Sequence, residues 1–292
     1  MNKDLRIRDL LTKNKQDASC YLWGYPDDEG IQLNGGRTGA SKGPDQIREC
    51  FLKMTPQYFN KKIWDGGNLS TQAPIAARHE LAKAQCLETL REKKFLITLG
   101  GGHDYGYPDS AAFVHYNEKS KKKPVVINFD AHMDVRPLDH GLTSGTPFYR
   151  LLSEFGKKVQ LIEVGIQDHC NSPEHILWAK KQGAHVILQN DILKKGLLNC
   201  LKPLLKKYPG HPTFISVDID AFSSAFAPGC SQSWPTGLDV HDFFEAFDDL
   251  FKKLNVQGLG IYEVSPPLDV GVLTSRLAAL IVYRALKNRG VV

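Results

Sequence analysis

The sequence lacks a long apolar run, a paired-cysteine motif and a concentrated charge, and each absence excludes a class of protein. No stretch approaches the roughly 18 apolar residues of a membrane span. Residues 1–15 have no long apolar core and no small-residue cleavage site, so we expect neither membrane association nor a signal peptide. The six cysteines lie far apart without a Cys-x-x-Cys pair, which favours reduced thiols in the cytoplasm. The net charge of +5 is spread along the chain, too diffusely to indicate nucleic acid binding, so we expect a small-molecule substrate, with a mild preference for an anionic one, and no nucleic acid.

The chain has the composition and patterning of a globular α/β protein. Its 292 residues are 42% hydrophobic and 24% charged, without an internal repeat or a linker. We therefore interpret residues 1–292 as one domain, with residues 1–19 as an N-terminal arm or short helix that packs against it.

Short apolar runs alternate with helical patterns along the chain. The expected strands are 20–24, 62–66, 95–99, 125–129, 159–165, 185–188, 213–217 and 258–264. The expected helices are 44–54, 73–93, 107–119, 143–154, 172–182, 191–207, 240–254 and 274–288. Regular alternation predicts a mainly parallel sheet covered on both faces, and both an open sheet and a closed barrel fit this pattern.

Three polar residues follow the most apolar of these strands in strict alternation. The run Val125 to Phe129 fits a buried parallel strand, and Asp130, His132 and Asp134 come directly after it. Side chains at alternate positions of an extended chain point to the same side, so two carboxylates and one imidazole converge. These donors form a recognisable metal-ligand set. The alternative is a strand end that runs into an ordinary polar turn.

Three other predicted strands also end in residues with ligand-type side chains. Three glycines lead to His103, another strand ends in Asp218 and Asp220, and Glu263 stands near the end of the last. The carboxyl ends of parallel strands meet at one edge of a sheet, where α/β proteins build their sites. Four crowded aspartates would repel one another unless cations lay among them, so the pattern predicts two divalent ions. Mn²⁺ suits mixed carboxylate and imidazole donors, and Zn²⁺, Fe²⁺ and Ni²⁺ remain alternatives.

A glycine-rich loop covers residues 34–45. It contains four glycines but no Gly-Lys-Ser/Thr, so it does not resemble a phosphate-binding loop. Its composition suits either a simple surface connection or backbone that must approach a site closely.

Three motifs resemble the signatures of the ureohydrolase family, which comprises arginases, agmatinases and formimidoylglutamases. They are Gly101-Gly-His103-Asp104, Asp130-Ala-His-Met-Asp134 and Ser216-Val-Asp-Ile-Asp220, and the resemblance covers roughly residues 30–290. It implies a three-layer α/β/α sandwich with an eight-stranded, mainly parallel sheet. It also implies a binuclear site with two Mn²⁺ ions, bound by His103, Asp130, His132, Asp134, Asp218 and Asp220.

Within that family, three segments look most like formimidoylglutamases: Arg136-Pro137, Thr143 to Phe148 and Ala221 to Gly229. Ser144 stands where guanidine-hydrolysing members have a proton-shuttling histidine, and Ser223 where they have a third aspartate. The first change argues against arginine hydrolysis and leaves the proton donor unidentified. The resemblance implies cleavage of N-formimidoyl-L-glutamate to glutamate and formamide in histidine degradation, by a homo-oligomer, and the cysteine pattern places this enzyme in the cytoplasm.

The same resemblance suggests roles for four residues around the metals. Glu263 and Asp134 are the expected catalytic residues, the first pairing with the cationic amidine group and the second holding a proton. Arg136 and Ser144 are the expected substrate contacts. For Arg136 the reason is its position two residues past Asp134, in the same alternation, which can place it beside the site; a guanidinium binds a carboxylate through two parallel hydrogen bonds. The alternative for Arg136 is a structural ion pair. Two other functions stay open, namely hydrolysis of another guanidino or amidino compound, and non-catalytic binding.

Overall fold

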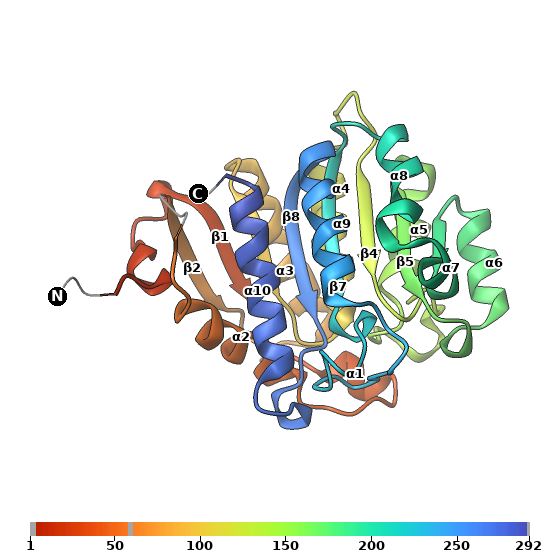
Figure 1. Cartoon of the computed structure of the whole chain (residues 1–292), viewed down its shortest axis with the longest axis horizontal. Helices are drawn as coiled ribbons and strands as arrows, with labels where there is room; N and C mark the ends of the chain where they lie inside the picture. The colour runs from red at the N-terminus through yellow and green to blue at the C-terminus, as the bar shows by residue number, and fades with distance from the viewer. Residues whose placement is uncertain (1–3, 58–60, 291–292) are drawn as a thin grey trace.

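The computed structural model describes residues 4–57 and 61–290, and the described residues contain one eight-stranded sheet (Figure 1). The strands are β1 (Ala18–Gly24), β2 (Lys62–Asn68), β3 (Phe95–Leu99), β4 (Val125–Phe129), β5 (Gln160–Ile166), β6 (His185–Leu188), β7 (Pro212–Asp218) and β8 (Asn255–Tyr262). They pair in parallel in the order β2-β1-β3-β8-β7-β4-β5-β6. The edge strands β2 and β6 do not pair with each other, so the sheet is open and the barrel alternative is wrong.

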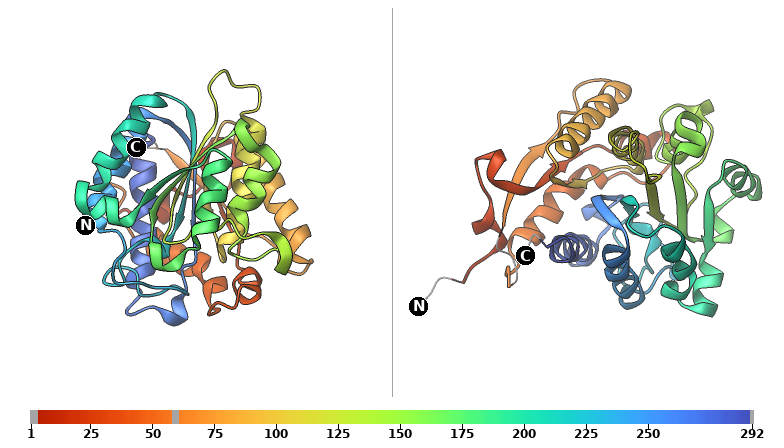
Figure 2. Two further views of the ribbon diagram at one scale, coloured as in Figure 1. Left: turned by 90° about the vertical axis from the view of Figure 1, so that its right-hand side faces the viewer. Right: turned by 90° about the horizontal axis from the view of Figure 1, so that it is seen from above.

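Helices cover both faces of this sheet, which confirms the three-layer sandwich (Figure 2). One face carries α3 (Ile75–Arg91), α4 (Gly106–Tyr116), α5 (Pro147–Phe155) and α6 (Pro173–Lys181). The other carries α2 (Gly43–Leu52), α7 (Gln189–Lys195), α8 (Leu197–Lys207), α9 (Val240–Lys253) and α10 (Leu273–Asn288). Successive residues of a strand pack on opposite faces of the sheet: Leu96 lies in the hydrophobic cluster on one face and Ile97 in the cluster on the other. No helix of the described residues is both long and apolar enough to cross a membrane.

Two helix starts follow directly from local capping chemistry. The Ser172 hydroxyl accepts a hydrogen bond from the Glu174 amide at 3.2 Å, with Pro173 in the first helical position of α6. The Asp239 carboxylate accepts from the His241 amide at 2.7 Å and begins α9. These two hydrogen bonds confirm both predicted helix starts. The apolar stripe of α9 packs into the core.

Several predicted element boundaries are wrong for identifiable reasons. The predicted helix 191–207 is two helices, α7 and α8, because Gly196 has a φ of +81° and breaks the chain direction. The last strand ends at Tyr262, one residue before Glu263.

The N-terminal segment is an arm with two single-turn 3₁₀ helices, Ile7–Leu10 and Lys15–Asp17, and residues 18–19 already belong to β1. Ile7 is buried, and its amide donates to the Met54 carbonyl at 2.9 Å, so the arm packs on the sheet layers as expected. Residues 1–3 lie outside the described residues. The single-domain interpretation of the whole chain stays a prediction.

The strands that carry the predicted ligands are neighbours in the middle of the sheet. The consecutive strands β3, β8, β7 and β4 lead at their carboxyl ends to His103, Glu263, Asp218 and Asp130, respectively. The short helix α1 (Glu29–Leu33) and the 34–45 loop lie beyond these ends (Figure 1). Residues up to 160 positions apart therefore meet at one edge of the sheet.

Candidate metal centre

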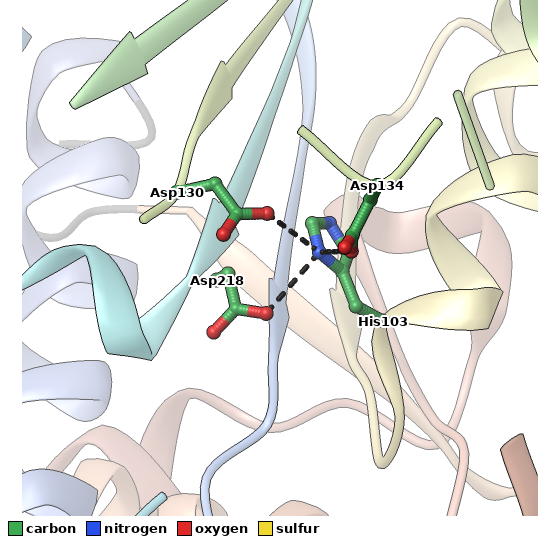
Figure 3. Close-up of side chains that lie close together, drawn as sticks. All are labelled: His103, Asp130, Asp134 and Asp218. Atoms are coloured by element: carbon green, nitrogen blue, oxygen red, sulfur yellow. Dashed lines mark ion pairs between the residues drawn. The ribbon is translucent and has the colours of Figure 1, made fainter. Parts of the chain in front are cut away.

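The structure brings all six predicted ligands together in two overlapping groups. In the first, His103 Nδ1 lies 3.1 Å from Asp130 Oδ2, 3.0 Å from Asp134 Oδ2 and 3.2 Å from Asp218 Oδ2 (Figure 3). In the second, His132 Nδ1 lies 2.9 Å from Asp220 Oδ2 and 3.6 Å from Asp130 Oδ1. Asp130 belongs to both groups, so it is placed to bridge two cations.

The ligands converge through tight turns, and the extended-chain reason given for their convergence is wrong. The chain bends at Ala131 and His132, and the Asp130 carboxylate accepts the His132 amide at 2.7 Å. Asp134 adopts a left-handed conformation with a φ of +47°. Asp218 likewise accepts the Asp220 amide at 2.9 Å and begins a 3₁₀ turn. Such aspartate turns point successive carboxylates inward without an extended backbone.

The His103 imidazole is fixed by a hydrogen bond and a ring stack, and its Nδ1 atom is available to a metal ion. Its Nε2 lies 2.9 Å from the Ser216 hydroxyl, and its ring stacks on Tyr262 at 4.8 Å and 26°. Its Nδ1 is buried and has no hydrogen-bond partner among the described residues. A neutral imidazole that donates from Nε2 to Ser216 keeps a lone pair on Nδ1, facing three carboxylates. The Nδ1 lone pair and the three carboxylates therefore form a suitable set of ligands for a cation.

Distances and electrostatics both fit a divalent cation at the group that contains His103. Two donors that each lie about 2.1 Å from one octahedral ion, at right angles, are about 3 Å apart, and the His103 contacts span 3.0–3.2 Å. Burial raises the pKa of Asp134 to about 6, and the nearby charge of Asp130 adds to the shift. Burial and the charge of Asp220 also raise the pKa of Asp218 well above its ordinary value. Cations would offset this crowding of buried negative charge.

Glu263 stands beside the ligands in a strained backbone conformation. Its φ is +66°, and only three other non-glycine residues of the described chain have positive φ: Lys93, Asp134 and Val272. Such a conformation costs about 1–3 kcal/mol and persists where surrounding contacts enforce it. Here the Glu263 amide donates to the Gly101 carbonyl at 2.8 Å. Burial raises the pKa of the Glu263 carboxyl well above its ordinary value.

A cavity of about 550 Å³ opens above the six ligands. Four of them and Glu263 line its floor, whereas His103 and Asp130 are fully buried beneath it. The predicted substrate contacts Arg136 and Ser144 both line its wall.

Sequence reasoning missed several wall residues, because they belong to no chemical motif, whether they lie in loops or, like His175, on a helix. They are His140, Asn171, His175, Gln232 and Trp234. The one useful signal was the glycine content of the 34–45 loop, whose Asn34 and Gly36 also line the cavity. Its interpretation as backbone that approaches a site closely is therefore the better one.

Comparisons with known proteins agree with this geometry. The Arginase family matches residues 18–287. The formimidoylglutamase of Bacillus subtilis (strain 168) is 38% identical over 266 residues, which cover 86% of this chain and 82% of that protein. That of Clostridium tetani (strain Massachusetts / E88) is 32% identical over 291 residues, covering 94% and 86%. The crystal structure of Trypanosoma cruzi formiminoglutamase with Mn²⁺₂ superposes with a TM-score of 0.88 at 27% identity, covering 99% of each chain.

Proposed function

Because the chain belongs to the arginase family, we propose that it is a binuclear-metal hydrolase that cleaves N-formimidoyl-L-glutamate to L-glutamate and formamide. This reaction is a step of histidine degradation. The observation that carries the proposal is the convergence of six nitrogen and oxygen donors under a cavity that also contains Arg136 and Ser144. The similarity to formimidoylglutamases over most of the chain supports the choice of substrate.

The cofactors are two Mn²⁺ ions, in keeping with the Mn²⁺ of the related Trypanosoma cruzi structure. His103, Asp134 and Asp218 would hold one ion, His132 and Asp220 the other, and Asp130 both. When bound, such a pair of ions supplies a water molecule of lowered pKa and neutralises developing negative charge.

Two carboxylates of the chain perform the remaining chemistry. Glu263 Oε1 is engaged by the His103 amide, which leaves Oε2 available to pair with the cationic formimidoyl group. This contact orients the formimidoyl carbon for attack by water. Asp134 accepts the proton that the water loses. The bond from that carbon to the glutamate nitrogen then breaks, and the departing amine takes up the proton.

The two carboxylates of the substrate distinguish it from arginine and agmatine. Arg136 is exposed at the cavity wall and forms no ion pair with the described residues, so its guanidinium is available to a carboxylate. The alternative interpretation, a structural ion pair beneath the loop, has no partner among those residues. Ser144 is 8% exposed and can donate its hydroxyl beside Arg136. We propose that these residues select the substrate.

A small substrate panel tests the proposal. The protein is purified with Mn²⁺, and release of formamide and urea is measured with formimidoylglutamate, arginine and agmatine. Rapid formamide release from formimidoylglutamate alone is expected. Preferential urea release would instead assign hydrolysis of another guanidino compound, and no release from any compound would favour a non-catalytic binding role.

We also propose a reducing, cytoplasmic setting and a homo-oligomeric state. The support for the first is that all six cysteines are free in the structure. The support for the second is the family resemblance, and light scattering on the purified protein tests it.

A further inference from the structure

The side chain of Asn34 hydrogen-bonds both residues that are proposed to contact the substrate carboxylates. Asn34 follows α1 and lines the cavity. Its Oδ1 accepts a hydrogen bond from Arg136 Nη1 at 3.1 Å, and its Nδ2 donates to Ser144 Oγ at 3.2 Å. The amide orientation follows from chemistry, because a guanidinium has only donors and must meet the oxygen. One neutral side chain therefore links Arg136 to Ser144.

This arrangement leaves both partners free to serve a ligand. Ser144 Oγ accepts from Asn34 and has no other hydrogen-bond partner among the described residues, so its own hydrogen is free to donate. Arg136 uses one guanidinium nitrogen for Asn34, and its remaining donors have no carboxylate partner in the described chain. A substrate carboxylate can thus receive the serine hydroxyl and the guanidinium together.

Asn34 is itself fixed by the backbone around it. Its amide donates to the Gly30 and Ile31 carbonyls at 3.2 and 3.1 Å, and the Ser144 amide donates to the same Gly30 carbonyl at 3.0 Å. The α1 segment and the segment of Ser144 are therefore joined by a main-chain bond as well as by the side chain of Asn34.

The residue after Ser144 leaves space for the arginine. A Cβ at Gly145 would lie 2.8 Å from Arg136 Cδ and 3.3 Å from Asn34 Oδ1. The Arg136 amide also donates to the Gly145 carbonyl at 2.8 Å. Arg136 is otherwise exposed to solvent, and long charged side chains lose rotamer freedom when they are held in one geometry.

We propose that Asn34 is a specificity-determining positioning residue, which holds the Arg136 guanidinium and the Ser144 hydroxyl in register for a carboxylate of the substrate. The role rests on the proposed function and deepens it. An amide suits this task because it accepts from the guanidinium without neutralising its charge. An aspartate at this position would compete with the substrate for Arg136.

A double-mutant cycle tests the role, with Asn34→Ala, Arg136→Ala and their combination measured in the Mn²⁺-loaded enzyme. The KM for formimidoylglutamate and the dissociation constant of L-glutamate are determined for each, the latter by titration calorimetry. Asn34→Ala is expected to raise both constants by about 3- to 10-fold while kcat changes by less than about twofold. In the Arg136→Ala background the same change should raise them by less than about twofold, because the arginine is no longer there to be oriented.

Three further measurements separate positioning from general damage. Asn34→Asp should raise KM by about tenfold or more, because the added carboxylate pairs with Arg136. Gln32→Ala, on the exposed surface of the same short helix, is the matched control and should leave both constants unchanged. Metal content should equal two ions per chain in every variant.

The outcomes distinguish this proposal from the proposed function. Equal effects of Asn34→Ala with and without Arg136 would overturn the positioning role, and so would a fall in kcat at constant KM. The dissociation constants of L-glutamate give the same double-mutant cycle from binding alone, independently of catalytic turnover. Absence of formamide release by the unaltered chain would overturn the proposed function, whatever the cycle shows.

Discussion

Glu263 Oε1 accepts a hydrogen bond of 3.0 Å from the backbone amide of His103, although the two residues lie 160 positions apart in the chain. The carboxylate at the end of β8 is thereby tied to the turn that presents a metal-binding imidazole at the end of β3. The backbone of Glu263, which has a strained φ of +66°, is held to the same turn, because its amide donates to the Gly101 carbonyl at 2.8 Å. Under the proposed function, a substrate cation that pairs with Glu263 would therefore be held at a fixed position relative to the metal centre.

Replacement of Glu263 by glutamine should remove charge while preserving this geometry. The amide oxygen of Gln can still accept from the His103 amide, but it no longer offers a negative charge to the cationic formimidoyl group. We expect kcat/KM to fall by about 10- to 100-fold, with two metals retained by elemental analysis. The exposed Glu245→Gln variant is the control. An unchanged kcat/KM in Glu263→Gln would exclude the pairing role.

Asp220→Ala should empty the metal group that contains His132. Within the described part of the chain that group has three candidate ligands, with His132 Nδ1 2.9 Å from Asp220 Oδ2, so loss of one leaves two. We expect the metal content to fall from two ions per chain to about one, and turnover to be abolished. Asp242→Ala, on the exposed face of α9, should retain both metals. Full metal content in the Asp220 variant would contradict the assignment.

Much of this site was predictable from the sequence. The ligand residues are recognisable by their side-chain types, and they follow directly after apolar strands. The apolar run of β4 predicts a buried parallel strand, and parallel strands place Asp130 and Asp218 at one edge. The left-handed backbone of Asp134 and Glu263 was not predictable, because tertiary hydrogen bonds enforce it against local preference. Wall residues such as Trp234 were missed because loops carry no periodicity.

A buried carboxylate on α4 connects the core to the metal centre. Asp109 is fully buried and accepts hydrogen bonds from the hydroxyls of Tyr25 at 2.7 Å, Thr98 at 2.5 Å and Tyr262 at 2.5 Å. The Tyr262 ring then stacks against the His103 imidazole. Burial raises the pKa of the Asp109 carboxyl, and the hydroxyl hydrogen bonds oppose this shift.

Asp109→Ala should therefore destabilise the protein strongly. The change removes the acceptor that three buried hydroxyls and the Cys86 thiol share, and it creates a cavity, so we expect the free energy of unfolding to fall by about 3–5 kcal/mol. Urea unfolding in chelator and in Mn²⁺ measures the effect. A loss below about 1 kcal/mol would show that the network contributes little, whereas the surface variant Asp242→Ala should stay within about 0.5 kcal/mol.

Thiol titration should distinguish two classes of cysteine. In denatured, unreduced protein we expect all six to react, because none forms a disulfide. In the native protein Cys20, Cys86 and Cys230 should be protected, since they are buried and burial raises the pKa of each thiol. A count of four or fewer in the denatured protein would contradict the reducing setting.

The last prediction concerns the choice of substrate through charge. Arg136 follows Asp134 by two residues and lines the same cavity, and its guanidinium bonds only Asn34 among the described side chains. Removing a charge-assisted contact costs about 1.5–3 kcal/mol, so Arg136→Ala should lower kcat/KM for formimidoylglutamate about 10- to 100-fold. Both metals should remain, because among the described residues the Arg136 guanidinium forms no hydrogen bond or ion pair with their ligands. Arg136→Lys keeps the charge but loses the planar fork, so an intermediate loss is expected. If Arg136→Ala retains its metals and its full kcat/KM, a carboxylate is bound elsewhere in the cavity, where His140 and His175 are the remaining basic side chains on the wall.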